Sequence, residues 1–279
     1  MLPGGPGFAG AYMRGTAELF SDVLRSHLID PHGSGGSTPP ADPADYSADG
    51  HAHFYEEVRV ALGLESVIVF GHSFGATTAL TYAARFPEST DRCIAVSPLG
   101  VGTEHDDAEG GAAETEMDAA LSRHAGASWY PNAKAVWDEW TDAVLAADDP
   151  GDVDRMMAAV LPLYTAYPER PEVAAALAGL ARDMKSDLAA SKAWEDGLYQ
   201  GVDLRPVLGG VRARTLVVAG ELDPICGPAQ AHPICEALPN ATLELIGDCG
   251  HFPNEEAPDR YRRAVTSWLR ATHSAGAQA

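Results

Sequence analysis

Short, continuous apolar runs along the chain predict the strands of a parallel sheet. SVIVF at 66–70 and RCIAVS at 92–97 are rich in aliphatic residues, a pattern typical of strands buried on both faces. TLVVAG at 215–220 and ATLELIG at 241–247 continue the series. SHLID at 26–30 predicts one more short strand, which runs into a long loop rich in Gly, Pro and Ser.

Apolar residues spaced by three and four positions predict helices around these strands. The segment 76–86 lies between the first two apolar runs, so strand, helix and strand form a βαβ unit of an α/β fold. Further helices are expected at 12–26, 47–63, 227–238 and 255–270. The residues expected to face inward are Leu19, Phe20, Val23 and Leu24 in the first, Phe54, Val58, Ala61 and Leu62 in the second, and Tyr261, Val265, Trp268 and Leu269 in the last.

The region 103–208 differs in composition from its two flanks. It opens with the acidic stretch EHDDAEGGAAETE and continues with helical patterns that contain four of the five tryptophans. We therefore expect a helical cap at 103–208, inserted into an α/β core that is formed by residues 1–102 and 209–279.

The sequence GHSFG at 71–75 follows a predicted buried strand and precedes a predicted helix. In this setting G-x-S-x-G forms a sharp turn that exposes a nucleophilic serine. Ser73 is therefore the candidate nucleophile, and the alternative is a plain structural turn. The amide of Phe74 would lie at the helix N-terminus, where it can stabilise an oxyanion.

A nucleophilic serine needs a base and an acid that orients the base. After such a turn the acid precedes the histidine in the chain. Asp223 ends a predicted strand in GELDP, and His251 follows the next strand in GDCGHFPNEE. These two are the candidate acid and base, with Glu221 and Asp248 as fallback acids. The alternatives are a helix-capping aspartate and a solvated histidine.

The remaining histidines and the cysteines point to no metal or cofactor. His72, beside the serine, is expected to pack beneath the turn. His32, His51 and His53 have no carboxylate at ligand spacing, so we expect them on the surface or in the core. None of the four cysteines forms a CxxC pair. We expect no cofactor and no metal.

The overall charge excludes one class of partner. The chain has 40 acidic and 19 basic residues, a formal net charge of −21, which would repel a phosphate backbone and argues against nucleic-acid binding. No stretch approaches the roughly 18 apolar residues of a membrane span, and the N-terminus does not resemble a signal peptide. We therefore expect a cytoplasmic protein whose partner is a small molecule or short peptide, and we leave its oligomeric state open.

Three motifs, GHSFG, GELDP and CGHFP, together resemble those of the α/β-hydrolase fold. The opening LPGGPG is similar to the HGGPG oxyanion loop of prolyl aminopeptidases (proline iminopeptidases), and DPHGSGGS is similar to their DxRGxGxS segment. The resemblance covers nearly all of 1–100 and 209–272. It implies a mostly parallel sheet flanked by helices, with the cap inserted between the sixth and seventh strands.

The chain departs from that family at several points. Pro3 and His32 stand where the family has His and Arg, and Phe74 stands where it often has Trp. The family has strands before its oxyanion loop, whereas this sequence begins on that loop. We therefore expect the N-terminal strands to be missing, neighbouring strand edges to be unpaired, and the oxyanion loop to be the loosest part of the site.

The resemblance implies an acyl-enzyme mechanism. Ser73 would attack an acyl carbon, His251 would take its proton, and Asp223 would fix the imidazole tautomer. The amides of Phe74 and Gly5 would hold the oxyanion, with Gly4 as the alternative second donor.

The first substrate hypothesis is an aminopeptidase that releases an N-terminal proline, which needs carboxylates in the cap to hold the substrate amine. Two alternatives remain open: a carboxylesterase or lactonase with the same triad, and a non-catalytic binding protein on the same fold. Acidic residues flanked by tryptophan also suit an ordinary helix face. The candidate substrate-binding residues are Trp137, Asp138 and Glu139 in VWDEW, and Trp194 and Glu195 in WEDG.

Overall fold

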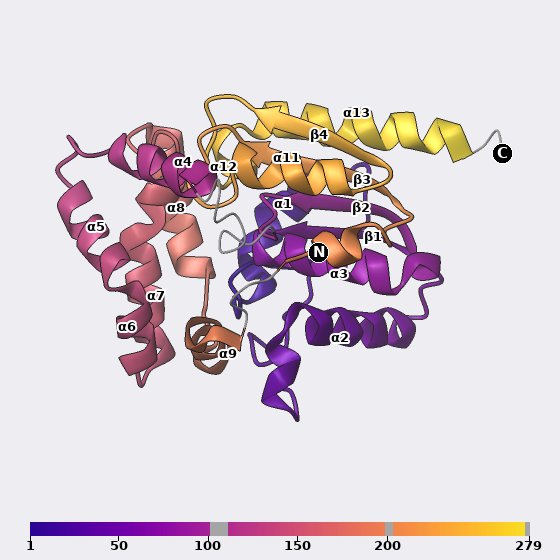
Figure 1. Ribbon diagram of the computed structural model, residues 1–279, viewed down its shortest axis with the longest axis horizontal. Helices are drawn as coiled ribbons and strands as arrows, with labels where there is room; N and C mark the ends of the chain where they lie inside the picture. The colour runs from indigo at the N-terminus through magenta and orange to yellow at the C-terminus, as the bar shows by residue number, and fades with distance from the viewer. Residues whose placement is uncertain (101–110, 199–202, 277–279) are drawn as a thin grey trace.

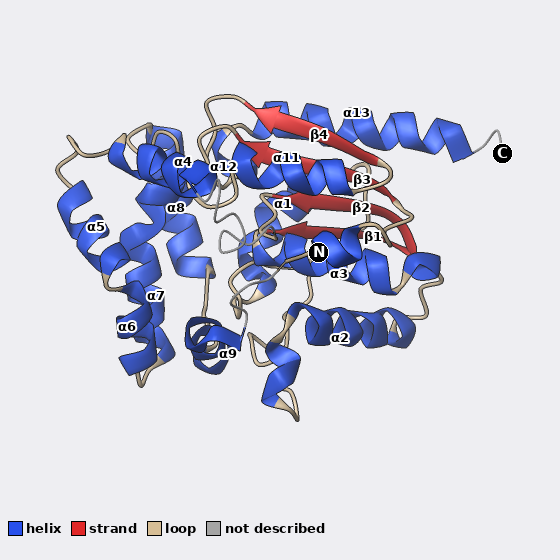
Figure 2. Ribbon diagram, in the orientation of Figure 1, coloured by secondary structure: helices blue, strands red, loops and turns tan. Residues whose placement is uncertain are grey.

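The computed structural model describes residues 1–100, 111–198 and 203–276. Its sheet has four parallel strands in the order β1-β2-β3-β4 (Figure 2). All four coincide with segments predicted to be strands, so these four strand predictions are confirmed. The strands are β1 (Val67–His72), β2 (Thr90–Val96), β3 (Arg214–Gly220) and β4 (Ala241–Ile246).

The two faces of the sheet carry two separate hydrophobic clusters. Side chains alternate across a strand, so Phe70 and Ile94 lie on one face while Val69 and Cys93 lie on the other. The first face packs against α1 (Arg14–Leu19) and α13 (Pro258–Gly276), and the second packs against α2 (Ala48–Ala61), α3 (Phe74–Arg85) and α11 (Pro228–Ala237) (Figure 1). The layers are therefore helix, sheet and helix, the α/β class expected from the sequence.

The predicted strand at 26–30 is wrong. The segment is irregular, and a cavity of about 730 Å³ separates it from the edge of β1. Its backbone therefore has no neighbouring strand with which to form a ladder, and a strand cannot be maintained without one. Residues 23–27, Ile29 and residues 66–70 line this cavity.

Two predicted helices differ in detail. The first is shorter than 12–26: a 3₁₀ turn (Gly10–Met13) leads into α1, and turns follow Leu19. In α2 the predicted inward face is partly wrong: Phe54 packs against the core as expected, but Ala61 and Leu62 at the end of the helix are exposed, whereas His51, Ala52 and Tyr55 are buried. In α13 the predicted inward residues Tyr261, Val265, Trp268 and Leu269 are buried, as expected.

Most helices of the chain segment between β2 and β3 lie beyond the carboxyl ends of the strands (Figures 1 and 2). Part of the acidic stretch that opens this region falls outside the described residues, and the core and cap boundaries stay a prediction. Among the described residues, no helix is long and apolar enough to cross a membrane. The inserted helices are α4 (Gly111–Ser122), α5 (Tyr130–Asp138), α6 (Trp140–Ala146), α7 (Pro150–Val160), α8 (Pro171–Asp183), α9 (Leu188–Ala193), a π-helical turn (Trp194–Leu198) and α10 (Arg205–Leu208).

The N-terminal loop is tied to both the sheet and the inserted region. The Leu2 N–H donates to the Phe70 carbonyl at 2.8 Å, and the His72 N–H donates to the Leu2 carbonyl at 3.1 Å. Further along the loop, the Gly7 carbonyl accepts from Ser34 Oγ at 2.7 Å and from the Asp187 N–H at 2.8 Å. The expectation of a loosely tethered oxyanion loop is therefore corrected, because long-range backbone bonds hold both of its ends.

Candidate active site

Ser73 lies at the turn between β1 and α3 in a strained backbone conformation. Its φ of 56° and ψ of −127° are unusual for a residue with a side chain. The Ser73 N–H donates to the Val96 carbonyl at 2.9 Å, which anchors the turn to the neighbouring strand. A Cβ at Gly75 would lie 2.2 Å from the Leu2 carbonyl oxygen, so only glycine fits there. The turn thus has the geometry expected for GHSFG.

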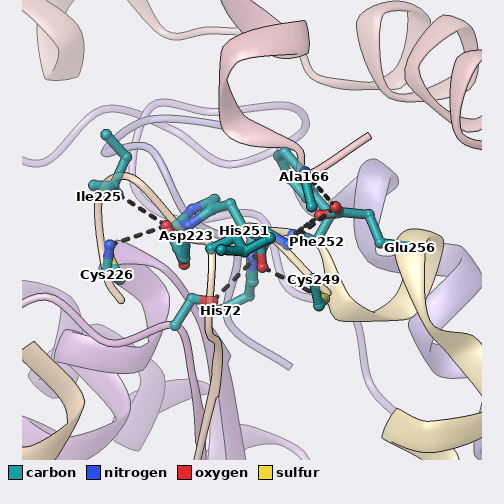
Figure 3. Close-up of polar contacts among 12 residues, drawn as sticks. His72, Ala166, Asp223, Ile225, Cys226, Cys249, His251, Phe252 and Glu256 are labelled. Atoms are coloured by element: carbon teal, nitrogen blue, oxygen red, sulfur yellow. Dashed lines mark hydrogen bonds and ion pairs between the residues drawn. The ribbon is translucent and has the colours of Figure 1, made fainter. Parts of the chain in front are cut away.

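Asp223 and His251 form a buried hydrogen-bonded pair (Figure 3). His251 Nδ1 donates to Asp223 Oδ2 at 2.8 Å, and the two residues are 3% and 1% exposed. Asp223 Oδ1 accepts from the Ile225 and Cys226 N–H groups at 2.9 and 3.0 Å. Burial opposes ionisation of Asp223, but the charge of His251 and these hydrogen bonds outweigh it and lower the pKa of the carboxyl. The pair leaves His251 Nε2 as the ring nitrogen that can serve as a base.

The fallback acids lie elsewhere. Glu221 is exposed, and so is Asp248, whose carboxylate accepts from Tyr167 Oη at 3.1 Å. The structure brings Asp223 to His251 instead, because Asp223 follows β3 and His251 follows the adjacent parallel strand β4.

His72 is buried beneath the turn and connects three parts of the site. Its Nε2 donates to the His251 carbonyl at 2.9 Å, and its Nδ1 lies 3.0 Å from the Tyr12 hydroxyl. Burial and the neighbouring His251 lower the pKa of His72 to about 3, so the ring is neutral. With a proton on Nε2, Nδ1 accepts the Tyr12 hydroxyl proton. His72 therefore positions the main chain of His251.

The Tyr12 hydroxyl also accepts from the Gly4 N–H at 2.5 Å. This corrects the assignment of Gly4 as the alternative oxyanion donor, because its N–H already donates to the Tyr12 hydroxyl. Gly5 and Phe74 line the cavity beside Ser73. Sequence reasoning missed Tyr12, since its partner His72 lies 60 residues further along the chain and no local motif joins them.

We expect Tyr12→Phe to lower the free energy of unfolding by about 1–3 kcal/mol, because it leaves the buried Gly4 N–H without its acceptor. Denaturant unfolding followed by tryptophan fluorescence measures the change. Tyr167→Phe is the matched control, since it removes a hydroxyl that bonds the exposed Asp248. Equal losses in the two variants would contradict the assigned role of Tyr12.

Ser73 and His251 line one cavity of about 360 Å³ beneath the inserted helices. Its walls are largely aromatic and aliphatic, and Glu195 is the one carboxylate among its described lining residues. Glu195 accepts from Trp140 Nε1 at 2.8 Å and from Thr141 Oγ1 at 2.7 Å. The side chains that line it include Phe8, Trp137, Trp140, Thr141, Tyr164, Trp194 and Glu195.

Two of the predicted substrate-binding residues lie outside this lining. Asp138 forms an exposed ion pair with Lys134, and Glu139 follows directly at the end of α5. Trp137, Trp194 and Glu195 do line the cavity. The larger cavity beside β1 contains none of Ser73, Asp223 and His251 in its lining, whereas the candidate nucleophile and base both line the smaller one.

A family model described as alpha/beta hydrolase fold matches residues 1–258. The chain belongs to this family. The hydrolase is 25% identical to a proline iminopeptidase of Lactobacillus delbrueckii subsp. bulgaricus, over 96% of this chain and 88% of that protein. It is also 26% identical to a 2-hydroxymuconate semialdehyde hydrolase of Pseudomonas putida, over 96% of this chain and 82% of that protein.

Solved structures share the fold of this hydrolase. An esterase from Thermogutta terrifontis matches with a TM-score of 0.68 and 20% identity, over 98% of this chain and 91% of that one. A proline iminopeptidase from Mycobacterium smegmatis matches with a TM-score of 0.66 and 21% identity, over 99% of this chain and 89% of that one. At these levels of sequence identity, the structural similarity shows a shared fold.

Metal-ligand atoms of Asp223, Cys226 and His251 lie within 4.8 Å of one another in the hydrolase. Two of these residues already bond each other. Burial, followed by the charge of Asp223, raises the pKa of the Cys226 thiol well above its ordinary value, so the sulfur keeps its proton. The group therefore suits an acid–histidine pair better than a cation site.

Proposed function

We propose that this hydrolase uses Ser73, His251 and Asp223 for acyl transfer through a covalent acyl-enzyme. The observation that carries the proposal is the buried 2.8 Å bond between His251 and Asp223, on a histidine that shares a cavity with the strained Ser73. In the proposed reaction, His251 Nε2 takes the Ser73 proton as Oγ attacks the acyl carbon. The imidazolium then protonates the leaving group, and His251 activates water to release the acyl group.

The amides of Phe74 and Gly5 are the proposed oxyanion donors. Phe74 begins α3, so the partial positive charge of the helix N-terminus adds to its N–H. Gly5 comes from the loop whose ends are held by β1 and by the segment at Asp187. Two donors from separate, anchored segments form a preorganised site for a developing negative charge.

We propose release of an N-terminal residue, proline first, as the activity. The relatives named proline iminopeptidase support this substrate class. In the cavity, the Glu195 carboxylate would accept a hydrogen bond from the substrate amine. A carboxylate has about four acceptor positions, so the bonds from Trp140 and Thr141 leave capacity for a ligand. The aromatic walls would hold an apolar ring.

The second candidate is a carboxylesterase or lactonase with the same triad. The observation that favours it is the composition of the cavity, which offers one carboxylate among mostly apolar side chains. Parallel assays with proline p-nitroanilide and short p-nitrophenyl esters separate the two activities. Turnover of the anilide supports the aminopeptidase, whereas activity confined to esters removes it.

We expect Glu195→Gln to raise KM for proline p-nitroanilide by roughly 10- to 100-fold, the range for losing a hydrogen bond to a charged group. KM for a p-nitrophenyl ester should change less than twofold, because an ester has no amine to bind. Asp138→Asn is the matched control, since Asp138 pairs with Lys134 outside the cavity lining. Equal effects of Glu195→Gln on both substrates would contradict the amine-binding role.

A further inference from the structure

Glu256, the last residue of α12 (Pro253–Glu256), is a partly buried carboxylate that accepts three backbone N–H groups (Figure 3). Its Oε2 accepts from Gly250 at 3.0 Å and from Ala166 at 2.7 Å, and its Oε1 accepts from Phe252 at 3.1 Å. Gly250 and Phe252 are the two neighbours of His251 in the chain. One side chain therefore holds the main chain on both sides of the candidate base.

The third donor, Ala166, belongs to the inserted region, and this region also contacts the loop around His251 directly. The His251 N–H donates to the Tyr164 carbonyl at 2.8 Å, two residues before Ala166. A Cβ at Gly250 would lie 2.4 Å from that same carbonyl oxygen, so the two backbones are in close contact. The Tyr164 ring also packs edge-on to His251 and lines the cavity. Glu256 thus joins the histidine loop to a wall of the substrate cavity.

We propose that Glu256 is a positioning residue, which fixes His251 relative to Ser73 by clamping the histidine loop against the segment from Tyr164 to Ala166. This inference rests on the proposed function of the site. Glu256 acts through the main chain at 250, 252 and 166, and it is distinct from the orienting acid Asp223.

Burial of Glu256 opposes its ionisation. Burial raises its pKa to about 7 against the pull of the three N–H donors, and Asp223 adds to the rise. Arg123 and Cys249 are the other titratable groups that interact with it. Because the folded state binds this proton more tightly, the carboxylate lowers the free energy of unfolding as pH rises from about 4.5 to about 7.

The test measures how fast a fluorophosphonate labels Ser73 at pH 8, where Glu256 is ionised. We expect Glu256→Gln to slow labelling by about 10- to 100-fold, because an amide nitrogen cannot accept from these donors and a small misplacement of His251 is costly. Glu256→Asp keeps the charge but shortens the reach, so it should recover part of the rate. Glu255→Gln is the matched control and should label within twofold of the unchanged protein, since Glu255 accepts from Asn254 on its own turn.

Folding is checked by thermal unfolding of each variant. A folded Glu256→Gln protein that labels within threefold of the unchanged protein overturns the proposal. If that variant does not fold, Glu256→Asp decides: its shortened side chain should still label more than threefold more slowly than the unchanged protein, and labelling within threefold overturns the proposal. If the fluorophosphonate does not label the unchanged protein, the proposed function fails, and proton NMR then tests the role of Glu256 by itself. The downfield resonance of the His251 Nδ1 proton should shift or broaden in Glu256→Gln. It should not change in the control, Glu255→Gln. An unaltered resonance in Glu256→Gln overturns the proposal that Glu256 positions His251.

Discussion

Replacing Ser73 by alanine is expected to abolish labelling by a fluorophosphonate and to lower kcat by about 10⁶-fold on whichever substrate the hydrolase turns over. The reason is chemical, because alanine has no atom that can form the acyl-enzyme. Mass spectrometry of the labelled protein gives the first result, and p-nitroaniline or p-nitrophenol release gives the second. The fold should be unaffected, since the turn is built by Gly71, Gly75 and their backbone contacts.

The exposed Ser122 at the end of α4 provides the control. Ser122→Ala should label and turn over like the unchanged protein. Unchanged hydrolysis by Ser73→Ala would remove the acyl-enzyme mechanism. If the fluorophosphonate fails to label the folded protein without any substitution, the remaining alternative, a binding protein on a hydrolase fold, would be favoured.

Local patterns predicted the parts of the fold that are decided locally. β1 and β2 are continuous aliphatic runs because helices cover both faces of the sheet, and few other structures bury such a run. The turn at Ser73 was also predictable, because the buried strand before GHSFG and the helix after it are both visible in the local sequence. Gly71 is required by contacts within the turn, because its Cβ would lie 2.0 Å from the Gly75 carbonyl oxygen. Gly75, by contrast, is required by the N-terminal loop, because its Cβ would lie 2.2 Å from the Leu2 carbonyl oxygen.

Features that depend on distant segments were not predictable. The sequence SHLID is rich in strand formers, but a strand also needs a neighbouring strand, and among the described residues this segment borders a cavity and the N-terminal loop instead. At the end of α2, Leu62 is exposed, whereas His51 is buried against Phe74 of α3, a contact that only the tertiary structure reveals. Glu256 looked like one more acidic residue in GHFPNEE, and its three donors become visible only when residues 166 and 250–252 are brought together.

We expect Asp223→Asn to lower kcat by about 10⁴-fold while the fold is retained. The amide has nearly the shape of the carboxylate, so the bonds from Ile225 and Cys226 to the side-chain oxygen can persist. Its NH₂ group, however, would face His251 Nδ1 as a donor and favour the tautomer with the proton on Nε2. That tautomer cannot accept the Ser73 proton, and no negative charge remains to stabilise the imidazolium.

The fallback acids supply matched controls for this prediction. Glu221→Gln and Asp248→Asn remove exposed carboxylates that flank the same two loops, and each should leave kcat within about twofold. A larger loss in either control than in Asp223→Asn would transfer the role of the acid to that residue. The comparison holds the change in net charge constant, so an electrostatic effect at long range would appear in all three variants.

The same substitution should also change how stability depends on pH. The pKa of Asp223 is lower in the folded protein than its ordinary value of 3.8, so its carboxylate stabilises the fold above that pH. This contribution declines as pH falls below about 4 towards the folded-state pKa. The difference in unfolding free energy between the unchanged protein and Asp223→Asn should therefore be constant at neutral pH and shrink on acidification. Urea unfolding at pH 7, 5 and 3.5 measures it, and a difference that grows on acidification would show that His251 does not stabilise a charged Asp223.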